Sequence, residues 1–260
     1  MMPGYAPARF SFDVRSTDTD CGDRLHLFAL FSFMQEAAYL HVQNMKDAFG
    51  DFDQQGLCWL LIRVSVRLKK RPGWRDAVTV ETSHRGVRRL TFIRDFIFYD
   101  QTGRSFGLAT SEWVVADRAQ HKPQRPRPGW PQNMVDKQLL ACPRLLPLPT
   151  EMKKPQLTLA PLYSDMDRNW HVNNARYVAW SLDVVKARQA SDDTASLLDV
   201  RSFDIHYIKE TGLGDTLNFY CEPDDTAQNG FLIETKLLSD GSSIFRARVG
   251  FSDHQSDQAL

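Results

Sequence analysis

The chain lacks net charge, long apolar runs and paired cysteines. Its 32 lysines and arginines equal its 32 aspartates and glutamates, so net charge gives no reason to expect nucleic acid or a membrane surface as a partner. The cysteines are too scattered for a zinc site or a disulfide scaffold, and they are Cys21, Cys58, Cys142 and Cys221. No apolar run approaches the roughly 20 residues of a membrane span. The first thirty residues show no basic segment followed by an apolar one, as an export signal would. We therefore expect a cytoplasmic protein with reduced thiols.

The first half of the 260 residues predicts a strand, a long helix and then antiparallel strands. Apolar residues recur at helical spacing from about Leu25 to Lys46, which indicates a helix with a buried face. From Leu57 the spacing changes to two, which is typical of a strand. Other strands are predicted at Arg9–Arg15, Ala77–Ser83, Leu90–Tyr99 and Phe106–Ala116.

Proline is concentrated between about Arg118 and Pro161, where nine of the 13 prolines occur among basic and polar residues. Such a composition is typical of a linker that crosses a surface. We expect three parts: an N-terminal part at 1–120, a linker at 121–156 and a C-terminal part at 157–260, and the two outer parts are repeats of one unit, as the next comparison shows.

The C-terminal part repeats the N-terminal part at an offset of 147 residues. Asp165 and Asp167 match Asp18 and Asp20, and a predicted helix at Asn174–Gln189 matches the first helix. Later strands and turns match in the same order. The expected fold class is therefore α+β, with two copies of one unit, each an antiparallel sheet laid along a helix.

The two copies differ in chemistry. In the alignment Asn169, His171 and Glu210 stand opposite Gly22, Arg24 and Arg71. Of the polar residues in the cluster, only Asp165 and Asp167 have a matching carboxylate in the first copy. If the polar cluster is catalytic, the chain has one active site, in its C-terminal copy, and the N-terminal copy is left to bind.

The polar cluster occupies alternate positions before the second helix. We expect Asp165, Asp167, Asn169 and His171 to point one way from an extended or looped segment. Two asparagines, at 173 and 174, then open the helix, and asparagine is a good N-cap. A turn that only caps the helix would explain either asparagine, but it would not explain four polar residues in alternation.

The sequence DMDRNWHVNNARY resembles the D-x-D-x-N-x-H-V-N-N-x-x-Y signature of the acyl-acyl-carrier-protein thioesterases of plants and bacteria. The blocks GLCWLLIRVSVRLKKRPGWRDAVTVET, RDFIFYDQTGRSFGLATSEWVVAD and FDIHYIKETGLGDTL are similar to the family's other blocks, in the same order. The resemblance implies a tandem hotdog fold. It also implies hydrolysis of fatty acyl-acyl-carrier protein, which releases the fatty acid, with acyl carrier protein as the partner.

The resemblance also implies roles for single residues. Asp167, Asn169, His171 and Glu210 match the family's catalytic residues, and Asn173 and Asn174 are candidates for substrate binding. Thr211 departs from the pattern, because many members carry cysteine there. A threonine hydroxyl is too weakly acidic to replace a thiol without a dedicated base, which favours attack by water with a carboxylate as base. Glu210 and Asp167 are both candidates for that carboxylate, and direct attack by either one as the nucleophile stays open.

In the family, part of the first lobe lines the acyl tunnel. Trp59 and Met34 are candidates for that lining, although core packing is the first explanation for such residues. Basic residues also gather in this half, either as ordinary solvated strand faces or as a landing surface for the acidic carrier and its phosphopantetheine phosphate. They are Arg63, Arg67, Lys69, Lys70, Arg71, Arg85, Arg88 and Arg89.

Several alternatives stay open at this point. An acyl-CoA thioesterase would use the same site, and a non-catalytic acyl-carrier binder would bind without releasing thiol. Gly103–Gly107 fits the G-x-S-x-G pattern of serine hydrolases, but it follows a polar turn and leads into a strand, whereas a nucleophile elbow leads into a helix. Four histidines, at 26, 41, 84 and 121, form no metal-binding pair with a carboxylate, so we expect neither a metal nor a cofactor. A homodimer is compatible with the sequence.

Overall fold

The computed structural model describes residues 6–45, 49–130, 138–142, 154–189, 197–224 and 229–252. The chain divides into two compact units. The first contains Met1–His26 and Ser32–Cys142, and the second contains Leu27–Phe31 and Pro143–Leu260. None of the helices in the described parts of the chain has the length and apolar content that a membrane crossing requires.

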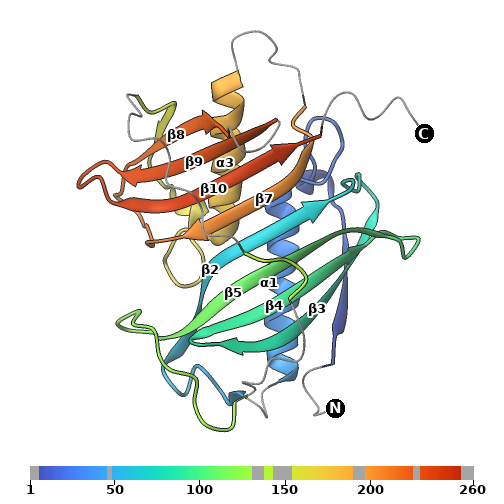
Figure 1. Cartoon of the computed structure of the whole chain (residues 1–260), viewed down its shortest axis with the longest axis vertical. Coiled ribbons are helices and arrows are strands. Elements are labelled where there is room, and N and C mark those ends of the chain that lie inside the picture. The colour runs from blue at the N-terminus through green and yellow to red at the C-terminus, as the bar shows by residue number, and fades with distance from the viewer. Residues whose placement is uncertain are drawn as a thin grey trace. The chain divides into compact units, whose positions relative to one another are not determined.

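The first unit is an antiparallel sheet with a long helix on one face (Figure 1). Its helix is α1 (Leu27–Asn44), whose residues from Ser32 onward belong to this unit. Its strands pair in the order β1, β3, β4, β5, β2. Their bounds are β1 (Ala8–Asp13), β2 (Leu57–Leu68), β3 (Ala77–Arg88), β4 (Thr91–Tyr99) and β5 (Ser105–Asp117). The predicted helix and strands are all present, with ends that differ by up to five residues.

Stacking and one buried polar network hold α1 to this sheet. The rings of Phe12 on β1 and Phe33 on α1 stack with centroids 4.8 Å apart. Arg94 Nη1 on β4 lies 2.8 Å from His41 Nδ1 on α1 and donates to Thr82 Oγ1 on β3 at 3.1 Å. Burial, and then the charge of Arg94, lower the pKa of His41 to about 4, so its imidazole is neutral and accepts a hydrogen bond from the guanidinium.

The proline-rich segment contributes a short described stretch, residues 138–142, that lies on the first sheet. The backbone N–H of Leu139 donates to Asp95 Oδ2 at 3.1 Å, and that of Leu140 donates to Thr110 Oγ1 at 3.0 Å. Ser65 Oγ donates to the carbonyl of Ala141 at 3.4 Å. These contacts explain why polar residues on this face of the sheet are buried.

The second unit repeats this plan around α3 (Asn174–Gln189), whose bounds agree with the predicted helix (Figure 1). Its strands pair in the order β7, β10, β9, β8, β6. They are β6 (Leu157–Leu159), β7 (Val200–Tyr207), β8 (Leu217–Pro223), β9 (Gly230–Leu237) and β10 (Ser243–Phe251). Aromatic rings fill the space between helix and sheet: Tyr177 meets Phe245 edge-on at 5.3 Å, and Trp180 meets Phe219 at 6.1 Å.

Candidate active site

Residues 167–171 form a tight turn, the looped alternative of the extended or looped segment that the sequence predicts. The backbone N–H of Asp167 donates to the carbonyl of His171 at 2.8 Å. Asp167 Oδ1 accepts the N–H of Asn169 at 2.7 Å and that of His171 at 3.4 Å. An aspartate that binds backbone N–H groups two to four residues later competes with extended structure, which is why the alternation was misleading. The expectation of a loop was right, and that of one shared direction was wrong.

Asp165 serves the scaffold. Its Oδ2 accepts the N–H of Leu162 at 2.7 Å, closing a short 3₁₀ helix at Tyr163–Asp165. Its Oδ1 pairs with Arg176 Nε on α3 at 2.6 Å. The carboxylate is buried, so it ties the turn to the helix and leaves substrate contact to other residues.

The two asparagines open α3. Asn173 Oδ1 accepts the N–H of Ala175 at 2.9 Å, so Asn173 is the N-cap. The carbonyl of Asn174 accepts the hydroxyl of Tyr207 at 3.1 Å. The N-terminus of α3 therefore lies two residues after His171, and it carries the positive end of the helix dipole. Substrate binding by Asn173 and Asn174 stays a prediction.

The loop after β7 brings Glu210 to this turn. The carbonyl of the next residue, Thr211, accepts the N–H of Val172 at 3.1 Å, which fixes the loop against the turn. Glu210 Oε2 lies 3.7 Å from His171 Nε2, and the two side chains are 41% and 31% exposed. Two of the predicted catalytic groups, 39 positions apart in the chain, are thus together and accessible to a substrate.

Asn169 sits on the same turn with its side chain exposed, and Asp167 lies at the base of the turn. The four predicted catalytic residues therefore belong to one turn and one loop of the second unit. Their catalytic roles stay predictions.

Thr211 has a structural role. Its side chain is 3% exposed, and its Oγ1 lies 2.8 Å from the hydroxyl of Tyr177 on α3. Burial raises the pKa of Tyr177 to about 12, so this phenol stays protonated and offers no base for the threonine. The structure therefore agrees with the prediction that residue 211 is not the nucleophile. Tyr177 was not among the predicted site residues, although it is the tyrosine that ends the D-x-D signature.

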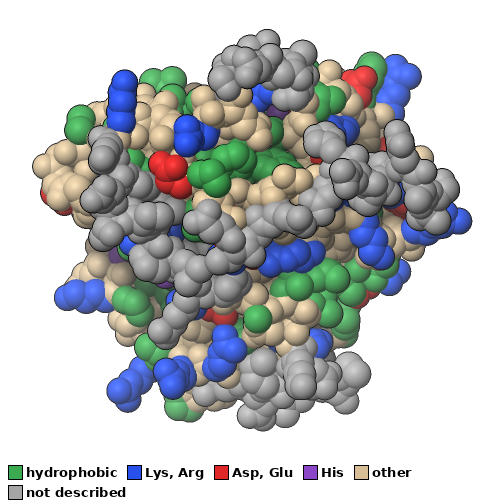
Figure 2. Space-filling model, turned by 45° about the horizontal axis from the view of Figure 1, so that its top comes forward, with side chains coloured by type: hydrophobic (Ala, Val, Ile, Leu, Met, Phe, Trp, Pro, Cys, Tyr) green, Lys and Arg blue, Asp and Glu red, His purple; other side chains and the backbone are tan. Residues whose placement is uncertain are grey.

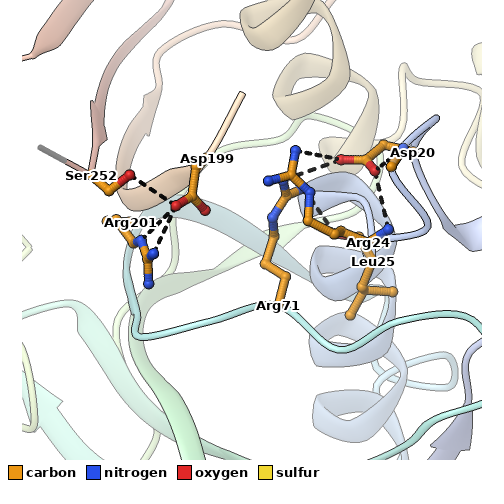
Figure 3. Close-up of polar contacts among 8 residues, drawn as sticks. Asp20, Arg24, Leu25, Arg71, Asp199, Arg201 and Ser252 are labelled. Carbon is orange, nitrogen blue, oxygen red and sulfur yellow. Dashed lines mark hydrogen bonds and ion pairs between the residues drawn. The ribbon is translucent and has the colours of Figure 1, made fainter. Parts of the chain in front are cut away.

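The first unit contains the same turn with different chemistry (Figure 3). Asp20 Oδ1 accepts the N–H of Gly22 at 2.9 Å and of Arg24 at 3.1 Å, as Asp167 does in the second unit. Its Oδ2 pairs with Arg71 Nη2 at 3.2 Å and Arg24 Nη2 at 3.4 Å. Burial opposes ionisation of Asp20, but these N–H groups and guanidinium charges outweigh it and lower its pKa.

Two guanidinium groups therefore occupy the positions of His171 and Glu210 in the repeat. Arg71 is almost fully buried, with 4% of its side chain exposed. A guanidinium cannot act as a base near neutral pH. The scaffold is shared between the copies, whereas a histidine and a glutamate stand at these two positions only in the second copy.

The basic residues of the first unit are largely paired with carboxylates of the same unit. Glu112 forms ion pairs with both Arg63 and Arg88 at 2.7 Å, and Lys70 forms one with Asp100 at 2.7 Å. Arg85 pairs with Asp95 at 3.2 Å, and Arg71 is engaged with Asp20. Figure 2 shows lysine and arginine side chains scattered over the face drawn rather than gathered on it. Substrate contact by Arg63 stays a prediction, and Glu112 offsets its charge.

Trp59 and Met34 lie in apolar surroundings of the first unit. Trp59 stacks on Phe52 at 5.0 Å and meets Phe92 edge-on at 4.9 Å, beside the buried Phe49. Met34 is buried on α1. Both positions fit core packing, and an acyl-chain contact by either residue stays a prediction.

Ser105 does not form a nucleophile elbow. It is the first residue of β5, it is exposed, and its hydroxyl donates to the carbonyl of Gly107 at 3.4 Å. An elbow requires a helix directly after the serine, and here a strand follows.

Comparison with known proteins places this site in a family. The model of the acyl-ACP thioesterase N-terminal domain matches residues 8–129, and that of the acyl-ACP thioesterase C-terminal domain matches residues 150–253. The chain belongs to the acyl-ACP thioesterase family. The resemblance seen in the sequence is therefore confirmed.

Relatives and solved structures agree with this assignment. Oleoyl-acyl carrier protein thioesterase 1 of Arabidopsis thaliana is 29% identical over 96% of this chain and 69% of its own length. Oleoyl-acyl carrier protein thioesterase 2 of the same plant is 30% identical over 67% of this chain and 53% of its own length. The match thus spans about half the length of the latter.

Among structures, an acyl-ACP thioesterase of Bacteroides thetaiotaomicron has a TM-score of 0.78 at 25% identity and covers 95% of this chain and 98% of its own. The 12:0-ACP thioesterase of Umbellularia californica has a TM-score of 0.76 at 23% identity, over 94% of this chain and 96% of its own. These likenesses confirm the expected α+β tandem hotdog fold.

Proposed function

We propose that this chain hydrolyses the thioester of fatty acyl-acyl-carrier protein, releasing free fatty acid and ending chain elongation. Membership of the acyl-ACP thioesterase family supports the reaction class. The single structural observation that carries the proposal is the approach of Glu210 Oε2 to His171 Nε2, at 3.7 Å, beside the N-terminus of α3. A carboxylate, an imidazole and a helix dipole together offer a base, a proton carrier and a place for developing negative charge.

Glu210 is the base in this proposal. Asp167 was the other candidate, but its Oδ1 accepts two backbone N–H groups of its own turn, so its main work is to hold that turn. Glu210 takes a proton from a water molecule, and the water oxygen bonds to the thioester carbonyl carbon. The carbon–sulfur bond then breaks, and the proton passes from Glu210 through His171 to the leaving thiolate.

Asn169 orients the attacking water from the exposed face of the turn. The carbonyl oxygen lies toward the N-terminus of α3, where the dipole stabilises the negative charge of the tetrahedral intermediate. Thr211 and Tyr177 take no chemical part, because each hydroxyl is buried and bonded to the other.

We assign the three parts of the chain different tasks: acyl-chain and carrier binding to residues 1–120, linkage to 121–156 and catalysis to 157–260. Arginines stand at the positions of His171 and Glu210 in the first repeat, which supports this division because neither can act as a base there. A cytoplasmic location and a homodimer remain proposals, to be tested by cell fractionation and analytical ultracentrifugation.

Thiol release from acyl-carrier protein tests the function directly. The purified chain is given one acyl group on carrier protein and, in parallel, on CoA, and the free thiol is measured with a chromogenic reagent. We expect turnover of both, with kcat/KM about tenfold or more higher for the carrier protein, because it offers additional protein surface to bind. Higher kcat/KM with CoA would identify an acyl-CoA thioesterase. Binding without thiol release would leave only a carrier-binding protein.

A series of acyl-carrier proteins from short to long, saturated and unsaturated, would then define the preferred chain. Trp59→Ala and Met34→Ala belong in the same series. An altered chain-length profile would place these side chains along the acyl group, and an unaltered profile would leave them as core residues only.

A further inference from the structure

Large apolar side chains are exposed on the two segments that carry His171 and Glu210. Tyr163 is 76% exposed, Trp170 68% and Leu213 50%. Trp170 directly precedes His171, and Leu213 follows Glu210 by three residues. The two segments touch, because a Cβ on Gly212 would lie 4.0 Å from the carbonyl oxygen of Trp170. We call Tyr163, Trp170 and Leu213 the apolar rim.

The repeat shows that the fold does not require the rim to be apolar. The corresponding residues of the first unit are Ser16, Asp23 and Trp74, so two of the three are polar. The backbone is the same in both copies. The N–H of Trp170 donates to the carbonyl of Asp167 at 3.1 Å, and that of Asp23 donates to the carbonyl of Asp20 at 3.0 Å. At two of the three positions the apolar choice therefore belongs to the unit that contains the His171–Glu210 pair.

Trp170 also occupies an unfavourable backbone conformation. Its φ is +61°, and that of Asp23 is +56°. Aspartate and asparagine tolerate this left-handed region, whereas a bulky residue there is an outlier. A strained and exposed tryptophan contributes little to folding, and such strain is typical of residues retained for binding.

We propose that the apolar rim binds the pantetheine arm of the thioester substrate, the part that carrier protein and CoA share. This inference rests on the proposed function. The arm leaves the site from the thioester sulfur, so residues next to His171 and Glu210 lie alongside it. It carries a geminal dimethyl group between polar groups, and aromatic side chains bind such mixed surfaces at low entropic cost. The rim thereby orients the thioester over Glu210.

Two thioesters of the same acyl group test this assignment, one with the full pantetheine arm and one with N-acetylcysteamine, which lacks the dimethyl group. In Trp170→Asn, asparagine suits the positive φ, so the fold is retained and the rim is lost. We expect kcat/KM for the pantetheine thioester to fall about tenfold, and the preference over the N-acetylcysteamine thioester to shrink toward one. Leu213→Ser is expected to act in the same direction. Trp74→Ser, at the matching position of the first repeat, is the control and is expected to keep the wild-type preference.

Equal losses with both thioesters would overturn the assignment, because the rim would then only support the site. A loss seen with acyl-carrier protein but not with acyl-pantetheine would also overturn it and would identify a protein-docking surface instead. If the wild-type chain hydrolyses none of these thioesters, the proposed function itself fails, and the rim's assignment fails with it. Thermal unfolding of each variant confirms that the comparison is made between folded proteins.

Discussion

Replacement of Glu210 by glutamine is expected to lower kcat for acyl-carrier-protein hydrolysis by about a thousandfold, because general-base catalysis contributes on this order. Glutamine keeps the size of the side chain and its exposed position near His171 but cannot accept a proton from water. We expect KM to change little, since the acyl chain and the arm bind elsewhere. Initial rates of thiol release measure both constants.

A matched control is Glu222→Gln. Glu222 is a part-exposed glutamate of the same unit that pairs with Arg188, near the opposite end of α3 from His171. This variant is expected to keep wild-type turnover. Near-wild-type turnover in Glu210→Gln would remove Glu210 from the mechanism and would leave Asp167 as the carboxylate to test.

Asn169→Ala is expected to lower kcat by about a hundredfold, in the range found when one polar group that acts in the transition state is removed. The turn should persist in this variant, because the backbone N–H of Asn169, rather than its amide side chain, donates to Asp167. Circular dichroism and thermal unfolding should therefore match the wild type. Steady-state thiol release gives the rate.

Ser105→Ala is the companion variant, and we expect it to be fully active because Ser105 opens a surface strand. If Ser105→Ala were inactive while Asn169→Ala retained its activity, the site would have to be moved from the second unit to a serine of the first.

The sequence predicted the elements well because their periodicities are strong. The second helix was placed at its observed bounds, since asparagines mark its start and apolar residues follow at helical spacing. The internal repeat was visible for a similar reason: the aspartates that close the two turns recur at a fixed offset. The two turns also share a hydrogen bond, because Asp20 and Asp167 each accept the backbone N–H of the residue two positions later.

Side-chain partners were harder to predict, because they come from distant parts of the chain. In the sequence, Arg63 suggests a positive surface. In the structure its guanidinium donates a hydrogen bond to Glu112, 49 residues later, whose carboxylate offsets the charge. Asp165 belongs by sequence to the polar alternation, yet its partner Arg176 on α3 makes it a scaffold residue. No sequence pattern near Tyr163, Trp170 or Leu213 predicts the apolar rim either. The one available clue was the alignment of the repeats, which sets Trp170 against Asp23.

The central claim is that water, activated at Glu210, attacks the thioester directly. A single-turnover experiment with the protein in excess over acyl-carrier protein, quenched on the millisecond scale, measures free thiol and free fatty acid together. We predict that both products appear with one rate constant and that Glu210→Gln slows both equally. A burst of thiol that precedes the fatty acid would reveal an acyl-enzyme intermediate and contradict the account.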